Sequence, residues 1–81
     1  MYDISADILK VAMKGARKSH IIYKANLNFL IVKKYLKLLQ NAELLTRTGR
    51  IYRTTEKGVK YINHFNRLKE YLFSDIMPLL R

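Results

Sequence analysis

The lysines and arginines are the residues of this sequence whose type and spacing indicate a function, and the function that they indicate is the binding of phosphate groups. The 81-residue chain carries a formal net charge of +10. Residues 8–55 contain eleven lysines and arginines but a single acid, Glu43, whereas residues 1–7 carry −2 and residues 56–81 carry +2. Because such self-repulsion gains a small domain nothing in folding, the asymmetry indicates a polyanionic partner.

The sequence lacks the groups that catalysis or metal binding would need. It contains no cysteine, six acidic residues and two histidines, His20 and His64, which lie far apart in sequence. The sequence shows no recognisable arrangement of a nucleophile with a base, of paired carboxylates or of metal ligands. The three glycines form no loop that would cradle a phosphate. We therefore predict no enzymatic activity, no cofactor, no metal site and no small-molecule substrate.

Length and hydropathy indicate one soluble domain. Apolar residues make up 49% of the chain, which argues against disorder, and the length suits a single small core. No apolar run approaches the ~18–20 residues that would cross a bilayer. Two aspartates among the first seven residues argue against a signal peptide. We expect a cytoplasmic protein without a membrane partner.

Apolar residues at helical spacing predict a first helix over about residues 4–15. Asp3 or Ser5 can cap its start, and Gly15 can end it. A short basic connection, Ala16-Arg17-Lys18, would follow.

The next segment has the spacing of a helix-turn-helix. Ser19 suits the N-cap of a short second helix, about residues 19–25. Asn26-Leu27-Asn28 then reads as a three-residue turn, in which Leu27 fills the angle and Asn28 caps the next helix. A short helix, a three-residue turn and a longer helix together form this motif.

The segment 28–41 predicts a longer helix with two unlike faces. Steps of ~100° per residue place four apolar side chains within about 60° of Val32. They are Phe29, Tyr35, Leu36 and Leu39. The opposite face collects Leu30, Lys33, Lys34 and Lys37, with no acid to neutralise the lysines. Three lysines alone would more often be a solvated face, but the preceding turn favours a nucleic-acid contact.

Two short β-strands are predicted next, over residues 44–46 and 51–54, with Thr48-Gly49 at the bend. Three arginines cluster around this bend: Arg47, Arg50 and Arg53. A β-hairpin directly after a recognition helix is a wing, and arginines there can reach phosphates or a narrow minor groove.

A long last helix is predicted from residue 56 to about residue 77, capped by Thr55 and disrupted beyond that point by Pro78. At ~1.5 Å per residue it would be ~33 Å long, more than the small body requires. Its apolar positions advance by three or four residues: Val59, Ile62, Phe65, Leu68, Leu72, Ile76 and Leu79. Such a helix is too hydrophobic to project alone into water. It could fold back on its own domain, but we favour pairing with a second copy.

Three motifs resemble those of a known family. Residues 18–28 read K-S-H-I-I-Y-K-A-N-L-N, similar to K-T-x-I-M-Y-x-A-N-L-S. Residues 34–39 are similar to K-Y-L-x-x-L, and residues 55–58 match T-E-K-G. The motifs, in this order, resemble those of the archaeal ten-kilodalton winged-helix DNA-binding proteins. The resemblance covers about residues 8–73.

The resemblance implies a winged helix whose terminal helices pair into an antiparallel coiled coil, giving an elongated dimer. The family includes both chromatin-type proteins and sequence-specific regulators. Two features depart from it. Leu30 and Ile31 stand where the recognition helix is usually polar, and there they could contact thymine methyl groups or a protein partner. Asn41-Ala42-Glu43 replaces the usual glycine before the first strand.

These features predict a mainly α protein with a small β-hairpin, namely a winged helix-turn-helix over residues 1–55 and a dimerisation helix over residues 56–81. We predict a homodimer that binds double-stranded DNA through helix 28–41 in the major groove, as a transcriptional regulator or as an architectural protein of the nucleoid. The predicted DNA-binding residues are Lys18, Ser19, His20, Asn28, Leu30, Lys33, Lys34, Lys37, Arg47, Arg50 and Arg53. The predicted dimer seam consists of Ile62, Phe65, Leu68, Leu72 and Ile76.

Two other functions stay open. The winged helix could instead bind a protein through Leu30, Ile31 and Leu38. RNA binding is less favoured, because it usually requires exposed aromatic platforms and the six tyrosines mostly fall on predicted helix stripes.

Overall fold

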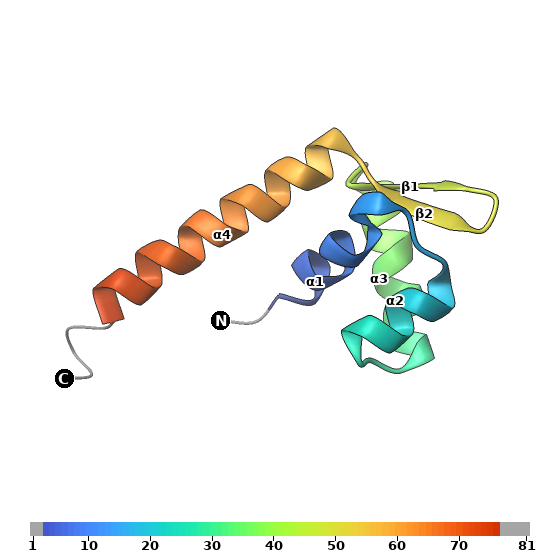
Figure 1. Cartoon of the computed structure of the whole chain (residues 1–81), viewed down its shortest axis with the longest axis horizontal. Coiled ribbons are helices and arrows are strands. Elements are labelled where there is room, and N and C mark those ends of the chain that lie inside the picture. Colours follow the sequence, from blue (N-terminus) through green and yellow to red (C-terminus); the bar gives the residue numbers. More distant parts are fainter. Residues whose placement is uncertain (1–2, 77–81) are drawn as a thin grey trace.

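The computed structural model describes residues 3–76, with side chains described up to Tyr71. The elements in chain order are α1 (Ile4–Val11), a 3-10 turn η1 (Ala12–Lys14), α2 (Lys18–Ala25), α3 (Phe29–Asn41), β1 (Leu45–Thr48), β2 (Ile51–Thr54) and α4 (Glu56–Ile76). This helical chain with one antiparallel hairpin has the predicted winged helix-turn-helix architecture (Figure 1).

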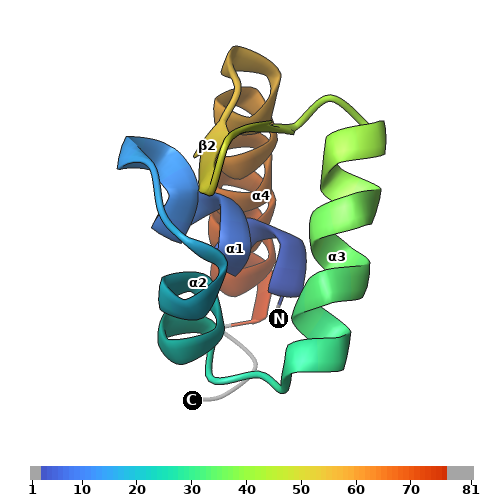
Figure 2. The same ribbon diagram turned by 90° about the vertical axis from the view of Figure 1, so that its right-hand side faces the viewer.

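The molecule is elongated because α4 runs past the remaining elements. Its principal extents are 49 × 26 × 19 Å, and Figure 1 shows the far end of α4 and the hairpin at opposite ends. Helix α1 packs against both α2 and α4. Turned by 90°, Figure 2 shows α1 at the centre, α2 and α3 on either side of it, and α4 behind. The helices therefore close around α1.

The core forms where these elements meet, and each helix and strand contributes buried side chains to it. The largest fully buried side chains are Ile8, Leu9, Ile21 and Val32. Helix α3 contributes Val32, Leu36 and Leu39. The prediction that these three residues lie on its core face is therefore confirmed. Burying a side chain of this size is worth ~1.5–3 kcal/mol.

Helix α1 begins where the sequence predicted, but it ends at Val11 rather than at Gly15, and a 3-10 turn follows it. Asp3 Oδ1 accepts a hydrogen bond from the Ser5 backbone N–H (2.9 Å), so Asp3 is the N-cap. After the 3-10 turn the chain reaches Gly15, whose φ of 91° is strained for any residue with a side chain. A Cβ at Gly15 would also lie 2.9 Å from Arg53 Nη2. The positive φ is the main reason for the glycine, because the Arg53 guanidinium ends a flexible side chain that could move aside.

The hairpin is anchored to the body by three hydrogen bonds between distant segments. Ala16 and Tyr52 exchange both backbone bonds, with N–O distances of 2.9 and 2.8 Å. Thr54 Oγ1 donates to the Leu9 carbonyl oxygen (2.6 Å). The wing is thereby fixed relative to the start of α2.

Helix α2 starts earlier than predicted. We expected Ser19 to be its N-cap, but the helix begins at Lys18 and Arg17 occupies the N-cap position without a capping side-chain bond. The cause is the pairing of Ala16 with β2. It leaves Arg17 extended (φ −80°, ψ 158°), and the helix begins immediately after it.

The predicted turn between α2 and α3 is confirmed. Asn26 adopts the left-handed conformation (φ 53°), which asparagine tolerates better than most residues. Leu27 packs against the core. Asn28 Oδ1 accepts from the Ile31 backbone N–H (2.9 Å) and caps α3.

Strand β2 has its predicted bounds, whereas the first strand and the bend lie a residue or two from theirs. Strands β1 and β2 pair antiparallel along their whole length, and Gly49-Arg50 forms the turn. We expected a first strand over residues 44–46 and a bend at Thr48-Gly49, and both positions were wrong. Leu44 lies outside the ladder because its backbone N–H donates to the carbonyl oxygen of Leu39 in α3 (2.9 Å).

The start of α4 is fastened to the end of α3, which explains the T-E-K-G motif. Thr55 Oγ1 accepts from the Gly58 N–H (3.0 Å), as the predicted cap, and donates to the Glu43 carbonyl oxygen (2.7 Å). Lys57 Nζ donates to the Ala42 carbonyl oxygen (3.0 Å). Gly58 is buried, and a Cβ there would collide with the backbone of the preceding loop.

Helix α4 packs on the body at its start and then extends past it. Ile62 is only 5% exposed, so the structure assigns it to the core of its own domain rather than to an exposed dimer seam. Phe65 is half-buried, whereas Leu68 and Tyr71 are 51% and 68% exposed. Several positions of interest lie outside the described residues, namely Met77, Pro78, Leu79 and the side chains of Leu72 and Ile76.

Candidate nucleic-acid interface

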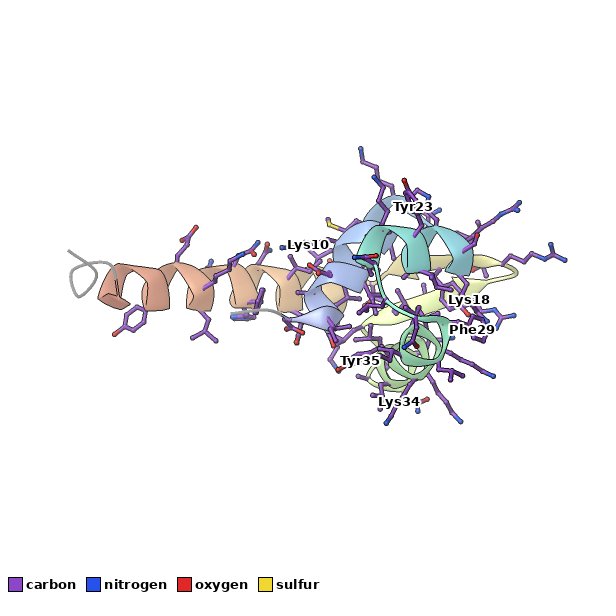
Figure 3. All side chains as sticks on the ribbon, turned by 90° about the horizontal axis from the view of Figure 1, so that it is seen from below. Lys10, Lys18, Tyr23, Phe29, Lys34 and Tyr35 are labelled. Atoms are coloured by element: carbon purple, nitrogen blue, oxygen red, sulfur yellow. The ribbon has the colours of Figure 1, made fainter. Side chains whose placement is uncertain are left out.

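Helix α3 presents a lysine face to solvent. Lys33, Lys34 and Lys37 are all exposed, and Leu30 lies on the same face near the N-terminal end of the helix. Figure 3 looks along α3 and shows Tyr35 pointing toward the body and Lys34 away from it. The predicted division of this helix into a core face and a lysine face is therefore confirmed.

Phe29 was predicted on the core face, but it is 50% exposed. It is the first residue of α3, where the helix extends beyond the core. The Lys18 ammonium lies 5.3 Å from the centre of its ring, a cation–π distance (Figure 3). This contact holds Lys18, at the start of α2, beside the start of α3.

A basic hollow of about 340 Å³ lies between the start of α2 and the wing. It is lined by Arg17, Lys18, Ser19, Arg47, Arg50 and Tyr52. Four of these six residues are cations and none is an acid. The first backbone N–H groups of any helix lack intrahelical partners, and the helix dipole makes that end positive. Since no side chain caps α2, its N-terminus adds to the positive potential of the hollow.

Arg47 is held in this hollow by two contacts. Its Nε donates to the Gly49 carbonyl oxygen (2.8 Å), and its guanidinium carbon lies 5.7 Å from the centre of the Tyr52 ring. Arg47 and Tyr52 are directly opposite each other in the ladder and so share one face of the hairpin. The side chain is thus positioned before any ligand arrives.

Arg53 lies on the other face of the hairpin. Neighbouring residues of a strand point to opposite faces, so Arg53 cannot share the side of Tyr52. It lines a separate hollow with Thr46, Thr48 and Ile51. The three wing arginines that we predicted as one cluster are therefore split, with Arg47 and Arg50 in the basic hollow and Arg53 outside it.

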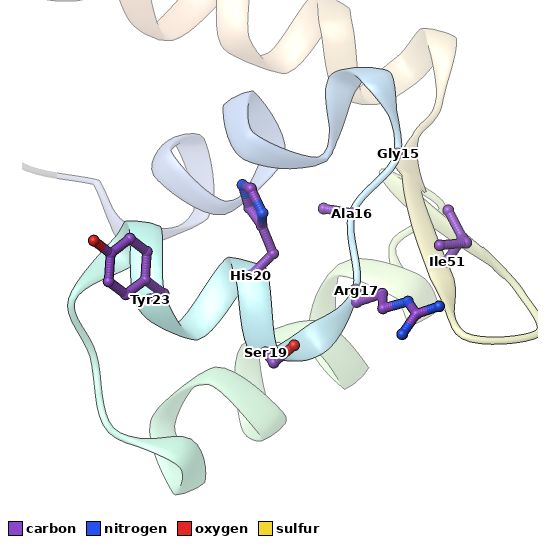
Figure 4. A pocket seen from close by; sticks show the side chains of 7 residues that line it. All are labelled: Gly15, Ala16, Arg17, Ser19, His20, Tyr23 and Ile51. Carbon is purple, nitrogen blue, oxygen red and sulfur yellow. The ribbon is translucent and has the colours of Figure 1, made fainter.

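A second hollow, of about 500 Å³, lies along the outer side of α2 (Figure 4). It is lined by Gly15, Ala16, Arg17, Ser19, His20, Tyr23 and Ile51. Figure 4 shows His20 and Tyr23 on α2, with Arg17 extending toward β2. Arg17 and Ser19 line both hollows. His20, one of the predicted DNA-binding residues, lies in this second hollow rather than in the basic one.

Three residues of this surface were not among the predicted contacts. Arg17 had been assigned only to a connection, Phe29 only to the core face of its helix and Tyr52 only to the second strand. Their positions depend on contacts between distant segments, chiefly the pairing of Ala16 with Tyr52. The excess of basic residues around Arg17 was the one sequence signal that could have identified it.

Two other kinds of site are absent from the described part of the chain. Within it, no three histidine or carboxylate side chains gather as metal ligands. Over the same residues, no helix is both long enough and apolar enough to cross a membrane.

Comparison with known proteins shows a family and a similar solved structure. The sequence profile of the winged helix-turn-helix family matches residues 1–73. The crystal structure of Sso10a-2, described as a DNA-binding protein from Sulfolobus solfataricus, superposes with a TM-score of 0.72 at 32% sequence identity. That similarity covers 96% of this chain and 93% of the Sulfolobus chain. No curated protein sequence matches this chain.

Proposed function

Because the chain belongs to the winged helix-turn-helix family, we propose that it binds double-stranded DNA with α3 in the major groove and the hairpin as the wing. The resemblance to the archaeal ten-kilodalton winged-helix DNA-binding proteins is confirmed by both matches. One observation carries the proposal. Helix α3 buries its apolar face and turns three lysines outward, beside a hollow that contains four further cations.

The contacts divide into phosphate and base contacts. Lys18, Ser19 and the wing arginines Arg47 and Arg50 line the basic hollow, so they hold the DNA backbone next to the groove that α3 enters. At the N-terminal end of α3, the cap residue Asn28 and Leu30 in the first turn lie nearest the bases. Asn28 Oδ1 already caps the helix, so Asn28 positions α3 as well as facing the groove.

The remaining predicted contacts complete this interface. Lys33, Lys34 and Lys37 meet phosphates on either side of the groove or the edges of bases. His20 and Arg53 lie outside the basic hollow, so they contribute less than Arg47 and Arg50.

The second part of the proposal is a homodimer formed through α4. Leu68 and Tyr71 are exposed on the part of the helix that extends past the body. Half-buried Phe65 lies one turn before Leu68, and Leu72 and Ile76 continue the same stripe in sequence. In this arrangement residues 1–55 bind DNA and residues 56–81 hold two copies together. Family resemblance points to antiparallel pairing.

The cellular role is that of a regulator or of an architectural protein of the nucleoid, in the cytoplasm. Lysines that contact phosphates bind every duplex alike, whatever its sequence. Binding of this kind favours the architectural role. A protein-binding function is the second candidate, because Leu30, Ile31 and Leu38 are all exposed on α3. In that case substitution of Leu38 would abolish binding of the protein partner and leave DNA binding unchanged.

DNA binding can be tested by titrating a labelled random-sequence duplex and following its fluorescence anisotropy at several salt concentrations. If a dimer places ~6–10 basic side chains on phosphates, affinity should fall ~10³–10⁵-fold between 50 and 200 mM salt. A nearly flat salt response would contradict the proposed function. Double-stranded RNA of the same length is the matched competitor, and preferential RNA binding would also contradict it.

A further inference from the structure

Leu30 is the most exposed large apolar side chain of α3, at 74%. It lies in the first turn of the helix, and its side chain is not part of the hydrophobic core. Its side chain is therefore not required for folding. An isolated exposed leucine is common on proteins, so its surroundings decide what it can do.

Those surroundings are cationic. Lys33, Lys34 and Lys37 follow Leu30 by three, four and seven residues, which places all four side chains on one face of α3. The exposed apolar residues that follow Leu30 in α3, Ile31 and Leu38, lie ~100° and ~80° around the helix from it and so fall outside the arc that the three lysines span. Leu30 is consequently the single apolar group within the lysine face.

Three positive charges around one apolar group determine which kind of partner can bind this face of α3. An apolar protein surface placed on Leu30 would have to remove water from the three lysines without neutralising them, which is costly. A DNA duplex supplies phosphates for the lysines. In its major groove it also displays one kind of apolar group, the 5-methyl of thymine.

We propose that Leu30 contacts the 5-methyl group of thymine, so that this protein prefers sites with thymine beneath the N-terminal end of α3. The proposal rests on the proposed function, because it specifies the base that α3 meets within the groove. It assigns sequence preference to an apolar contact rather than to a hydrogen bond.

Replacing thymine by deoxyuridine tests this directly, because the substitution removes the methyl group and keeps every hydrogen-bonding group. The probe is a duplex of alternating A and T, compared with the same duplex containing deoxyuridine throughout. Affinities are measured by anisotropy at one fixed salt concentration. The wild-type protein should bind the deoxyuridine duplex ~3–5-fold more weakly for each methyl group that Leu30 would otherwise cover.

Two variants separate a direct contact from an effect on DNA shape. Leu30→Ala should bind both duplexes equally, because the side chain that meets the methyl group is gone. Leu38→Ala, the same change just outside the arc of the lysines and ~80° from Leu30, should retain the wild-type preference. If Leu30→Ala also retained the preference, the methyl group would act through DNA shape or another residue, and the proposal would be overturned.

The remaining outcomes distinguish this inference from DNA binding itself. Equal, salt-dependent binding of both duplexes by the wild-type protein would overturn the thymine contact and leave the proposed function intact. No binding to either duplex would overturn both. A gain in affinity when cytosine is replaced by 5-methylcytosine in a G·C duplex, absent in Leu30→Ala, would give independent support.

Discussion

The hydroxyl of Tyr61 donates a hydrogen bond to Oδ2 of Asp3, which ties the start of α1 to the second turn of α4. The other carboxylate oxygen of Asp3 caps α1, so one aspartate fixes both helices. The hydrogen bond to Asp3, followed by burial and the negative charge of Asp3, raises the pKa of Tyr61 from 10.0 to about 12. This contact sets the direction in which α4 leaves the body.

The Tyr61 contact predicts how stability changes at high pH. In the unfolded chain Tyr61 ionises near its ordinary pKa of 10.0, and in the folded protein at about 12. Its contribution to the free energy of unfolding is therefore complete below pH 10 and is lost as the pH rises to about 12. Tyr61→Phe should lower the free energy of unfolding at neutral pH by ~1 kcal/mol and show a shallower decline in the alkaline range.

Urea unfolding at a series of pH values measures both effects. Tyr71→Phe is the matched control, because Tyr71 is exposed and the chemical change is identical. It should leave both the stability and its pH dependence unchanged. Equal alkaline declines in Tyr61→Phe and the wild-type protein would show that this hydrogen bond does not stabilise the fold.

Gly58 should not tolerate alanine, although it lies in a helix. An exposed helical Gly→Ala change normally gains ~0.5–1 kcal/mol. Here the added Cβ meets the Leu44 carbonyl oxygen and Thr54 Cγ2, so we expect a net loss of ~1–3 kcal/mol. Thermal unfolding provides the measurement. Asn63→Ala, at an exposed position of the same helix, should be neutral or slightly stabilising, and a more stable Gly58→Ala would refute the packing described here.

The two faces of the hairpin should contribute unequally to DNA binding. Arg50 lines the basic hollow, whereas Arg53 lies on the opposite face. Arg50→Ala should weaken binding to all duplexes alike and reduce the slope of log affinity against log salt by ~1. Arg53→Ala removes the same charge and should have the smaller effect. A larger loss in Arg53→Ala would mean that the wing approaches DNA by its other face.

Substitution in the exposed part of α4 tests the proposed dimer. Leu68→Glu should give a folded monomer that binds DNA more weakly, since burying an exposed leucine in each copy is worth ~1.5–3 kcal/mol. Sedimentation at tens of micromolar measures the association state. Asn63→Glu adds the same charge at a position ~140° around the helix and should remain a dimer. A monomeric wild-type protein at that concentration would rule out the dimer.

The parts of the fold that were predicted from sequence depend on local patterns. The apolar period of residues 28–41 was enough to predict the buried Val32 and the exposed lysines of α3. Asn28 and Thr55 were predicted as caps because their side chains bond to backbone groups three residues away, and both caps are present. Such interactions can be recognised within a few neighbouring residues.

The errors arise where distant segments meet. The start of α2 depends on the pairing of Ala16 with Tyr52, which no local pattern shows. The wing arginines were predicted as one cluster because the hairpin register was unknown, and a shift of one residue moves a side chain to the other face. Glu43, in the segment that replaces the family's usual glycine, adopts the left-handed conformation (φ 64°), which the sequence could not indicate.

The central claim is that DNA binds at α3 rather than to the positive charge of the protein as a whole. A comparison of two triple variants with equal charge loss tests it, each titrated with one duplex at several salt concentrations. The first variant is Lys33→Ala, Lys34→Ala and Lys37→Ala on α3, and the second is Lys60→Ala, Arg67→Ala and Lys69→Ala at exposed positions of α4. We predict that the α3 variant reduces the salt slope by ~3 per protomer and loses most of its affinity, while the α4 variant keeps both close to wild type. Equal losses in the two variants would contradict the claim, because net charge alone would then account for binding.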